Sequence, residues 1–134
     1  MGSFADYLEN ELLDHVWGGG DYTRPGTLYI ALSTTTINDD GTGMTEPAGG
    51  SYARASVTNN ATNWPAASGG AKANGTAITF ATATASWGTI VDFAIMDAIT
   101  SGNMLGYGTL TASKTIDNGD TASFAIGDLD ITLD

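Results

Sequence analysis

Residues 87–97, Trp-Gly-Thr-Ile-Val-Asp-Phe-Ala-Ile-Met-Asp, form the most apolar run of the 134-residue chain. Successive side chains of a β-strand point to opposite faces of the sheet, so a strand here has two distinct faces. One face carries Val91, Phe93 and Ile95, and the other carries Ile90, Asp92, Ala94 and Met96. The run predicts a β-strand within a second half of the chain that is dense in strands.

Working outward from this run, shorter segments on both sides also indicate strands. Residues 28–33 alternate as a half-buried strand, and residues 128–133 alternate strictly and predict an end strand with a solvated acidic face. Further strand-like segments lie at residues 52–58, 78–80, 104–110, 114–116 and 123–126. About seven short strands separated by turn residues predict a mainly β fold, an antiparallel β-sandwich or jelly-roll-like domain.

One α-helix is predicted at the N-terminus, over residues 3–17. Ser3 and Asp6 match a capping box in its Asp variant, and the run Gly18-Gly19-Gly20 ends the helix. An apolar stripe follows the helix period and consists of Phe4, Leu8, Leu12 and Val16, widened by Leu13 and Trp17. We therefore expect residues 1–20 to form an amphipathic helix with a glycine hinge, and residues 21–134 to form a single β-sandwich domain.

The charge balance excludes two classes of partner. The chain carries 15 acidic and four basic residues, which gives a formal net charge of −11. Nucleic acids and anionic membrane surfaces both attract basic proteins, so an acidic chain suits neither. In addition, no apolar run approaches the roughly 20 residues of a membrane span. We expect neither a nucleic acid nor a membrane as partner. The absence of cysteine is typical of a protein that folds in a reducing cytoplasm.

Residues able to do chemistry are few, and their spacing does not favour catalysis. The single histidine, His15, lies in the last helical turn, where a cation suits the helix dipole. Asp128 and Asp130 share one strand face, but the surrounding alternation favours a solvated face over a glycosidase pair. The acidic turns at residues 39–41 and 117–120 lack the twelve-residue calcium-loop pattern. We expect no catalytic residue, no cofactor and no metal.

Contacts with another protein are better supported than catalysis. Trp64, followed by Pro65 in a long loop, either anchors a subunit interface or folds back onto its own core, and the sequence leaves both open. Acids concentrate at the two chain ends, so the less charged loops of residues 34–75 are the expected contact region. The candidate interface residues are Phe4, Leu8, Leu12, Val16, Trp17 and Trp64.

The opening of the chain reads Ser3-Phe-Ala-Asp-Tyr-Leu-Glu-Asn-Glu-Leu-Leu-Asp14, then a glycine run, then Tyr22-Thr-Arg-Pro-Gly-Thr-Leu-Tyr-Ile-Ala-Leu-Ser-Thr34. Together with residues 50–54, 78–80, 86–89 and 127–132, these segments resemble a family of small tailed-bacteriophage virion proteins commonly labelled phage tail fibre proteins. The resemblance covers nearly the whole chain. It implies a non-enzymatic virion component and supplies no catalytic residues.

Three roles suit such a component. A compact domain without coiled coils or repeats favours a capsid decoration (cement) protein, a small homo-oligomer such as a trimer bound to the major capsid protein. A tail-fibre or tail-appendage protein bound to other tail proteins is the alternative, and a module that binds a host-surface glycan is the third. We expect the chain on the outer surface of the virion after synthesis in the host cytoplasm. The helix should dock against a neighbouring subunit or across its own sandwich.

Overall fold

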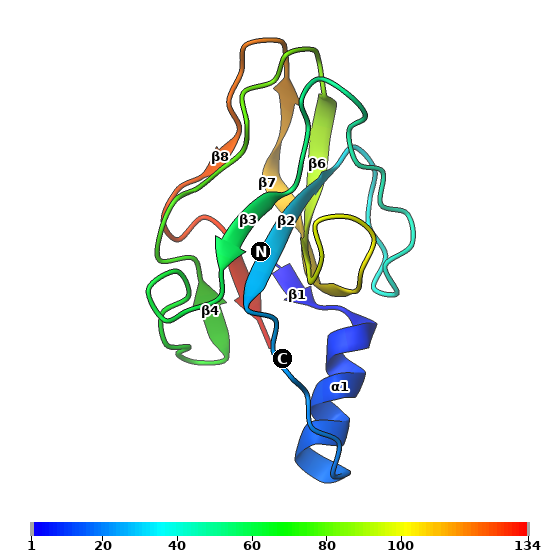
Figure 1. Ribbon diagram of the computed structural model, residues 1–134, viewed down its shortest axis with the longest axis vertical. Coiled ribbons are helices and arrows are strands. Elements are labelled where there is room, and N and C mark those ends of the chain that lie inside the picture. Colours follow the sequence, from blue (N-terminus) through cyan, green and yellow to red (C-terminus); the bar gives the residue numbers. More distant parts are fainter. Residues whose placement is uncertain (1, 134) are drawn as a thin grey trace.

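The computed structural model describes residues 2–133, which contain nine strands and one helix joined by loops (Figure 1). Seven strands form one sheet in the order β3-β2-β6-β7-β1-β9-β4, and β5 pairs with β8 in a second, small sheet. The elements are β1 (Gly2–Phe4), α1 (Asp6–Trp17), β2 (Thr27–Ser33), β3 (Ala55–Thr58), β4 (Ala71–Ala73), β5 (Ile78–Thr79), β6 (Gly88–Met96), β7 (Met104–Ile116), β8 (Ser123–Phe124) and β9 (Asp130–Thr132). The prediction of a mainly β fold with an N-terminal helix is confirmed. Within these residues, no helix is long and apolar enough to cross a membrane.

The apolar run at residues 87–97 forms β6, which pairs antiparallel with both β2 and β7. Phe93 and Ile95 pack into the main hydrophobic core, whereas Ala94 and Met96 pack into a second, smaller cluster on the opposite face. The predicted alternation is confirmed for residues 93–96. It is wrong for Ile90, which packs into the main core with Phe93, because the strand register is irregular between Ile90 and Asp92. Because β6 is buried on both faces, it anchors the sheet from its middle.

Residues 34–51 cover the second face of β2 and β6. Ile37 is buried there, and its backbone N–H donates to the buried carboxylate of Asp92 at 2.8 Å. The backbone N–H of Thr45 donates to the hydroxyl of Ser33 at 3.0 Å. Residues 28–33 form the predicted strand, within β2, but the prediction that only one of its faces is buried is wrong for this reason. A covering segment of irregular conformation leaves no periodic signal in the sequence.

A buried arginine ties this covering segment to the rest of the body. Arg54 is 7% exposed, and its guanidinium donates to both carboxylate oxygens of Glu46, at 3.0 and 2.8 Å. Its Nη1 also donates to the backbone carbonyls of Ala98 and Ser101, at 2.7 and 2.8 Å. One side chain therefore joins three segments that are distant in the sequence.

Glu46 is held in its charged form by this network. The hydroxyl of Tyr52 donates to Glu46 at 2.8 Å while accepting the backbone N–H of Leu32 at 3.0 Å. Burial by itself raises the pKa of Glu46, but the hydrogen bonds from Arg54 and Tyr52 outweigh it and hold that pKa below its usual value.

Residues 2–4 form strand β1 instead of the first helical turn. β1 lies between β7, to which it is antiparallel, and β9, to which it is parallel. The predicted capping box is wrong, because Ser3 belongs to this strand and the N-cap is Ala5, which makes no side-chain cap. Ala5 donates its backbone N–H to the carbonyl of Leu105 at 3.0 Å. Sheet pairing has overridden the local helix signal, so α1 begins at Asp6 and the expected segment 1–20 is shared between sheet and helix.

The C-terminal strand also differs from its prediction. β9 has three residues instead of six and lies between β1 and β4, so it is an inner strand. Asp128 precedes it and closes a turn, where its carboxylate accepts the backbone N–H of Ala125 at 3.2 Å. The parallel β1–β9 pair is the exception to the expected antiparallel sheet.

Gly2 has to be glycine because β1 is enclosed by its neighbours. A Cβ at this position would lie 2.6 Å from Cδ1 of Ile131, 2.8 Å from the backbone oxygen of Tyr107 and 3.0 Å from Cζ of Phe93. We expect Gly2→Ala to lower the free energy of unfolding by about 1–3 kcal/mol, measured by chemical denaturation. Gly26→Ala is the matched control, since nothing lies within 4 Å of its Cβ position. Equal losses in both variants would show that the sheet contact is not the cause.

The Arg54–Glu46 pair predicts a defined pH dependence. The folded-state pKa of Glu46 lies below its unfolded value of about 4.5, so its stabilisation is present above that value and lost as the pH falls through the folded pKa. Glu46→Gln should therefore have a lower free energy of unfolding than the wild type at neutral pH. Its free energy of unfolding should also fall less than that of the wild type when the pH is lowered. Denaturation curves at neutral and acidic pH measure this difference. Parallel losses in the two proteins would contradict it.

Candidate functional site

Helix α1 projects from one end of the body (Figure 1), and large apolar side chains near its far end are exposed. None of its twelve residues is buried. Leu13, Val16 and Trp17 are 54%, 57% and 78% exposed, and we call these three residues the helix tip. The helix ends as predicted in the glycine run, where Gly19 takes a φ of 83°. Clustered large apolar side chains in water mark a contact surface.

Only the first part of the predicted apolar stripe faces the body. Leu8 packs against the main core, and Leu12 is half-buried. The tip does not pack against its own body, so the expectation of docking across its own sandwich is wrong for these residues. The reason is that β1 fixes the start of the helix at the sheet and directs its far end away from it.

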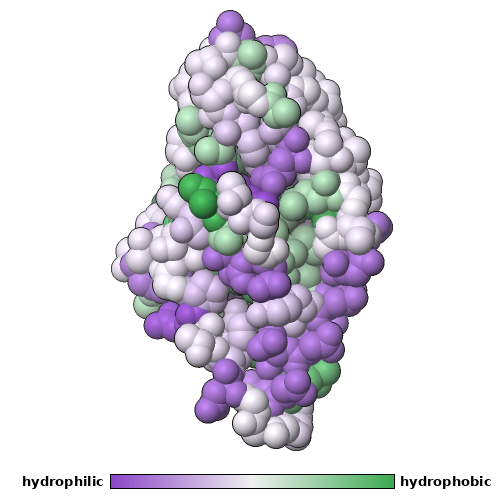
Figure 2. All heavy atoms as spheres, turned by 45° about the vertical axis from the view of Figure 1, so that its right-hand side comes forward, coloured by the Kyte–Doolittle hydropathy of each residue, from purple (hydrophilic) through white to green (hydrophobic). Residues whose placement is uncertain are grey.

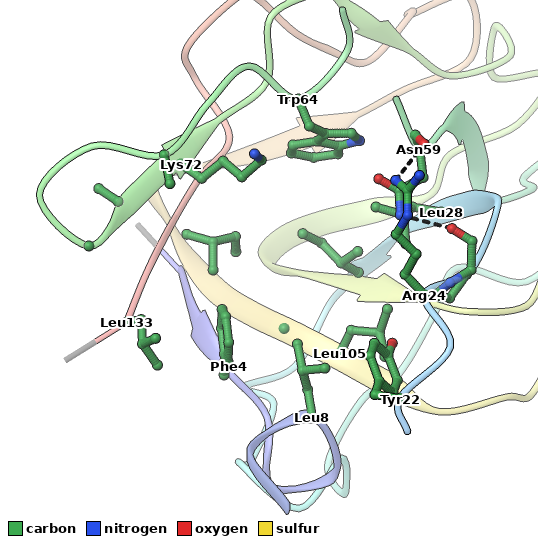
Figure 3. Close-up of a pocket in the computed structure, with 17 residues that line it drawn as sticks. Phe4, Leu8, Tyr22, Arg24, Leu28, Asn59, Trp64, Lys72, Leu105 and Leu133 are labelled. Atoms are coloured by element: carbon green, nitrogen blue, oxygen red, sulfur yellow. Dashed lines mark hydrogen bonds between the residues drawn. The ribbon is translucent and has the colours of Figure 1, made fainter. Parts of the chain in front are cut away.

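A mostly apolar pocket of about 340 Å³ lies beside the base of the helix, and we call it the Trp64 pocket (Figure 3). Strand and helix residues from distant parts of the chain line it. Its apolar wall includes Phe4, Leu8, Trp64, Leu105, Ile131 and Leu133. Of the predicted interface residues, the structure thus brings Phe4, Leu8 and Trp64 together, and it leaves Val16 and Trp17 on the helix tip.

Two cations stand at this pocket. Figure 3 shows Arg24 and Lys72 on opposite sides of Trp64, and together they are half of the four basic residues in the chain. Arg24 donates to the backbone carbonyl of Asn59 at 3.3 Å. None of the described residues that line the pocket carries a carboxylate side chain. The pocket is therefore a locally basic place on a strongly acidic protein.

Trp64 forms part of both the core and the pocket wall. It is 7% exposed and belongs to the main hydrophobic cluster, so in the isolated chain its ring packs onto its own core. Its indole Nε1–H has no hydrogen-bond partner among the described residues. A buried donor without a partner costs about 1–3 kcal/mol, so an acceptor supplied from outside would be stabilised here.

A cluster of acids surrounds the start of the helix. The carboxylate oxygens of Asp6, Glu9 and Asp39 lie within 4.8 Å of one another, and all three residues are exposed. Figure 2 shows hydrophilic residues gathered over the lower part of the face drawn there. The negative charge of Asp39, with a smaller effect of burial, raises the pKa of Asp6. Oxygen ligands in this arrangement suit a hard cation such as calcium, but exposed acids are also common without one.

His15 lies at the helix end, as predicted. Its Nδ1 accepts the backbone N–H of Tyr22 at 3.3 Å and lies 3.9 Å from a carboxylate oxygen of Asp21. Both neighbours follow the glycine run, so the histidine helps to hold the chain where it turns back toward β2. These contacts are those of a structural residue at a helix terminus.

Sequence reasoning missed the two cations of the Trp64 pocket and the acidic cluster. Arg24 and Lys72 lie 48 positions apart, and Asp39 meets Asp6 only because residues 34–51 fold back over the sheet. None of these contacts has a local pattern. The one available signal was the small number of cations. An acidic chain with only four basic residues has few places where the surface can be locally basic.

Removing the charge of Asp39 should stabilise the protein at neutral pH. The pKa of Asp6 is raised in the folded state, so its ionisation opposes folding, and this penalty disappears as the pH falls through its pKa. We expect Asp39→Asn to raise the melting temperature at neutral pH, with a smaller gain at about pH 3, where carboxyls with an ordinary pKa of about 4 are largely protonated. Asp40→Asn is the control, because Asp40 contributes least to the raised pKa of Asp6, and hydrogen bonds from Thr42 lower the pKa of Asp40 itself. A gain from Asp40→Asn alone would contradict this assignment.

Comparison with known proteins agrees with the resemblance noted in the sequence. A search of curated proteins finds no match. A family model described as "Podophage GP4 fiber I protein gp80" matches residues 3–132, and thus includes the helix and every residue that lines the Trp64 pocket except Leu133. The expected kinship with phage virion proteins of the tail-fibre type is confirmed. The chain belongs to this family of podophage fibre proteins.

Proposed function

We propose that this chain is a non-enzymatic structural subunit of a phage tail fibre, that it works as a homo-oligomer on the outer surface of the virion, and that the helix tip is its docking surface. The observation that carries the proposal is the exposure of Leu13, Val16 and Trp17 on a helix that stands clear of the body. The family description, which names a fibre protein, supports the tail as the location.

Burial of the helix tip supplies a realistic driving force for docking. Complete burial of one large apolar side chain is worth about 1.5–3 kcal/mol, before the entropy lost on association. Three such side chains on one rigid helix therefore support a specific contact. A helix already folded in the free chain also avoids the cost of ordering a flexible segment.

Capsid decoration is the second candidate. The sequence ranked it first because the chain lacks coiled coils and repeats, and the body with one projecting helix is consistent with a clamp between capsid subunits. The description of the family favours the tail instead. Copy number separates the two roles, since decoration requires a copy for most positions of the head lattice and a tail fibre requires few.

A glycan-binding role has less support. Such a site stacks exposed aromatic rings on sugars, and Trp64, the loop aromatic singled out by the sequence, is buried in the core. Trp17 is exposed, but it lies among apolar neighbours on the helix tip. An apolar, aromatic surface of this kind suits a protein partner better than a hydroxyl-rich sugar.

The test changes the helix tip in phage and measures incorporation. We expect phage that encode Leu13→Ser, Val16→Ser and Trp17→Ser together to yield virions that lack this protein in quantitative mass spectrometry. Deletion of residues 1–17 is unsuitable, because it also removes β1 from the sheet. Ile99→Ser with Ile126→Ser is the control, since both isoleucines are exposed elsewhere. Normal incorporation of the tip variant, with a wild-type circular dichroism spectrum, would contradict the proposal.

A further inference from the structure

We infer that the Trp64 pocket of one copy receives the helix tip of a second copy, so that the chains join tip to pocket. This inference rests on the proposed homo-oligomer and names both of its contacting surfaces. The pocket offers an apolar wall with cations at its mouth, and the tip offers exposed apolar side chains next to an acid. Four observations support the match.

The tip cannot fill the pocket of its own chain. Leu8 already lines that pocket from the base of the helix. Trp17 follows nine residues later, which places it about 13 Å further along at a rise of about 1.5 Å per residue. The helix runs away from the body over this length (Figure 1). The occupant has to come from another molecule.

The pocket has the size and lining for an aromatic anchor. Its volume of about 340 Å³ is at the lower end of the range for binding pockets, roughly 300–1,000 Å³. It therefore has room for an indole and one neighbouring side chain. Tryptophan seated in a desolvated pocket is a common hot spot of protein interfaces. Trp17, the most exposed of the large apolar residues, is the side chain that fits this role.

Charge selects this pocket among the surfaces of the molecule. Two copies of −11 each repel one another, so a stable contact has to bring acids of one copy to cations of the other. Arg54 is buried against Glu46. Lys114, on β7, lines a different pocket whose lining also contains the acids Asp120 and Asp128. Arg24 and Lys72 remain, both at the Trp64 pocket. The helix tip carries the exposed acid Asp14 beside Leu13.

The unpaired indole of Trp64 adds an independent observation. Its Nε1–H is buried and lacks a partner among the described residues, in a ring that forms part of the pocket wall. Figure 3 shows the nitrogen edge of this ring on the side where Arg24 stands. A carboxylate such as that of Asp14 would accept a hydrogen bond from the exposed Arg24, and it would reach the shielded Trp64 Nε1–H only if the pocket wall opened slightly around it. The pocket thus supplies one unused donor, the Trp64 Nε1–H, beside an Arg24 guanidinium whose Nη1 already donates to Asn59.

Mixing two defective variants tests this pairing. The tip variant combines Val16→Ser and Trp17→Ser, and the pocket variant combines Arg24→Glu and Lys72→Glu. Each should be a monomer in size-exclusion chromatography with light scattering, whereas the wild type should be an oligomer. Mixed in equal amounts, they should form a 1:1 heterodimer, because one copy keeps its pocket and the other keeps its tip. We expect the tip change to weaken wild-type self-association by at least about thirtyfold, the effect of losing a hot spot.

Matched controls separate this contact from general effects. Lys114→Glu changes the net charge as much as Lys72→Glu does, but it lies outside the pocket and should leave the oligomer intact. Ala67→Trp, at an exposed position that lines the pocket, should block entry without a change of charge. Each variant is compared with the wild type by circular dichroism and thermal melting, so that loss of folding is recognised. If one pocket variant fails to fold, the other takes its place in the mixing experiment.

Three results would overturn the inference. If both pocket variants, the double glutamate variant and Ala67→Trp, formed oligomers of the same size as the wild type, the tips would bind a different surface. Failure of the folded tip and pocket variants to combine would exclude a tip-to-pocket contact. A wild type that stays monomeric in this assay would exclude a second copy as the occupant. If the wild type is an oligomer and the triple tip variant is lost from virions, the proposed fibre role stands and only this inference fails. A monomeric wild type would also contradict the homo-oligomer of the proposed function, and normal incorporation of the triple tip variant would contradict the proposed docking role itself.

Discussion

The rest of the structure depends on one constraint, which is the backbone pairing of strand β1, residues 2–4, with β7 on one side and β9 on the other. This short strand joins the beginning of the described chain to its end, because it pairs with β9. On its other side, β9 pairs with β4. It also places the first residue of α1 directly at the sheet, which directs the helix outward and leaves its tip exposed. Phe4, at the end of the same strand, lines the Trp64 pocket. One strand therefore positions both the projecting helix and the pocket beside it.

Charges of opposite sign gather at two places beside strand β1. Around the helix start, acids lie close enough together to oppose one another, and around the Trp64 pocket, cations have no acid in the lining. In a protein with a net charge of −11, most pairs of surfaces repel, so this uneven distribution restricts the ways in which two copies can meet. The buried Arg54–Glu46 pair is different, since it fixes the covering segment to the body and serves the fold alone.

The sequence predicted the features that rest on local pattern. Alternation identified β6 and the faces of residues 93–96, but not the irregularity that moves Ile90 to the main core, and the glycine run located the end of α1. It failed where distant segments compete with local signals. Ser3 and Asp6 matched a capping box, but β7 and β9 offered backbone hydrogen bonds that the helix start could not equal. The candidate site divides in the same way: Phe4, Leu8, Val16, Trp17 and Trp64 were found from hydrophobicity and aromatic character, whereas Arg24 and Lys72 reach the pocket only through the tertiary fold.

We propose the exposed helix tip as the surface through which this fibre protein assembles. A cryo-electron microscopy map of the intact virion, at a resolution that traces α1, would show where the tip lies. We expect copies of this domain at the tail, with the helix tip of one copy seated in the Trp64 pocket of the next. Copies whose helix tips remain in solvent, or a lattice of copies on the head with the pocket empty, would contradict this proposal.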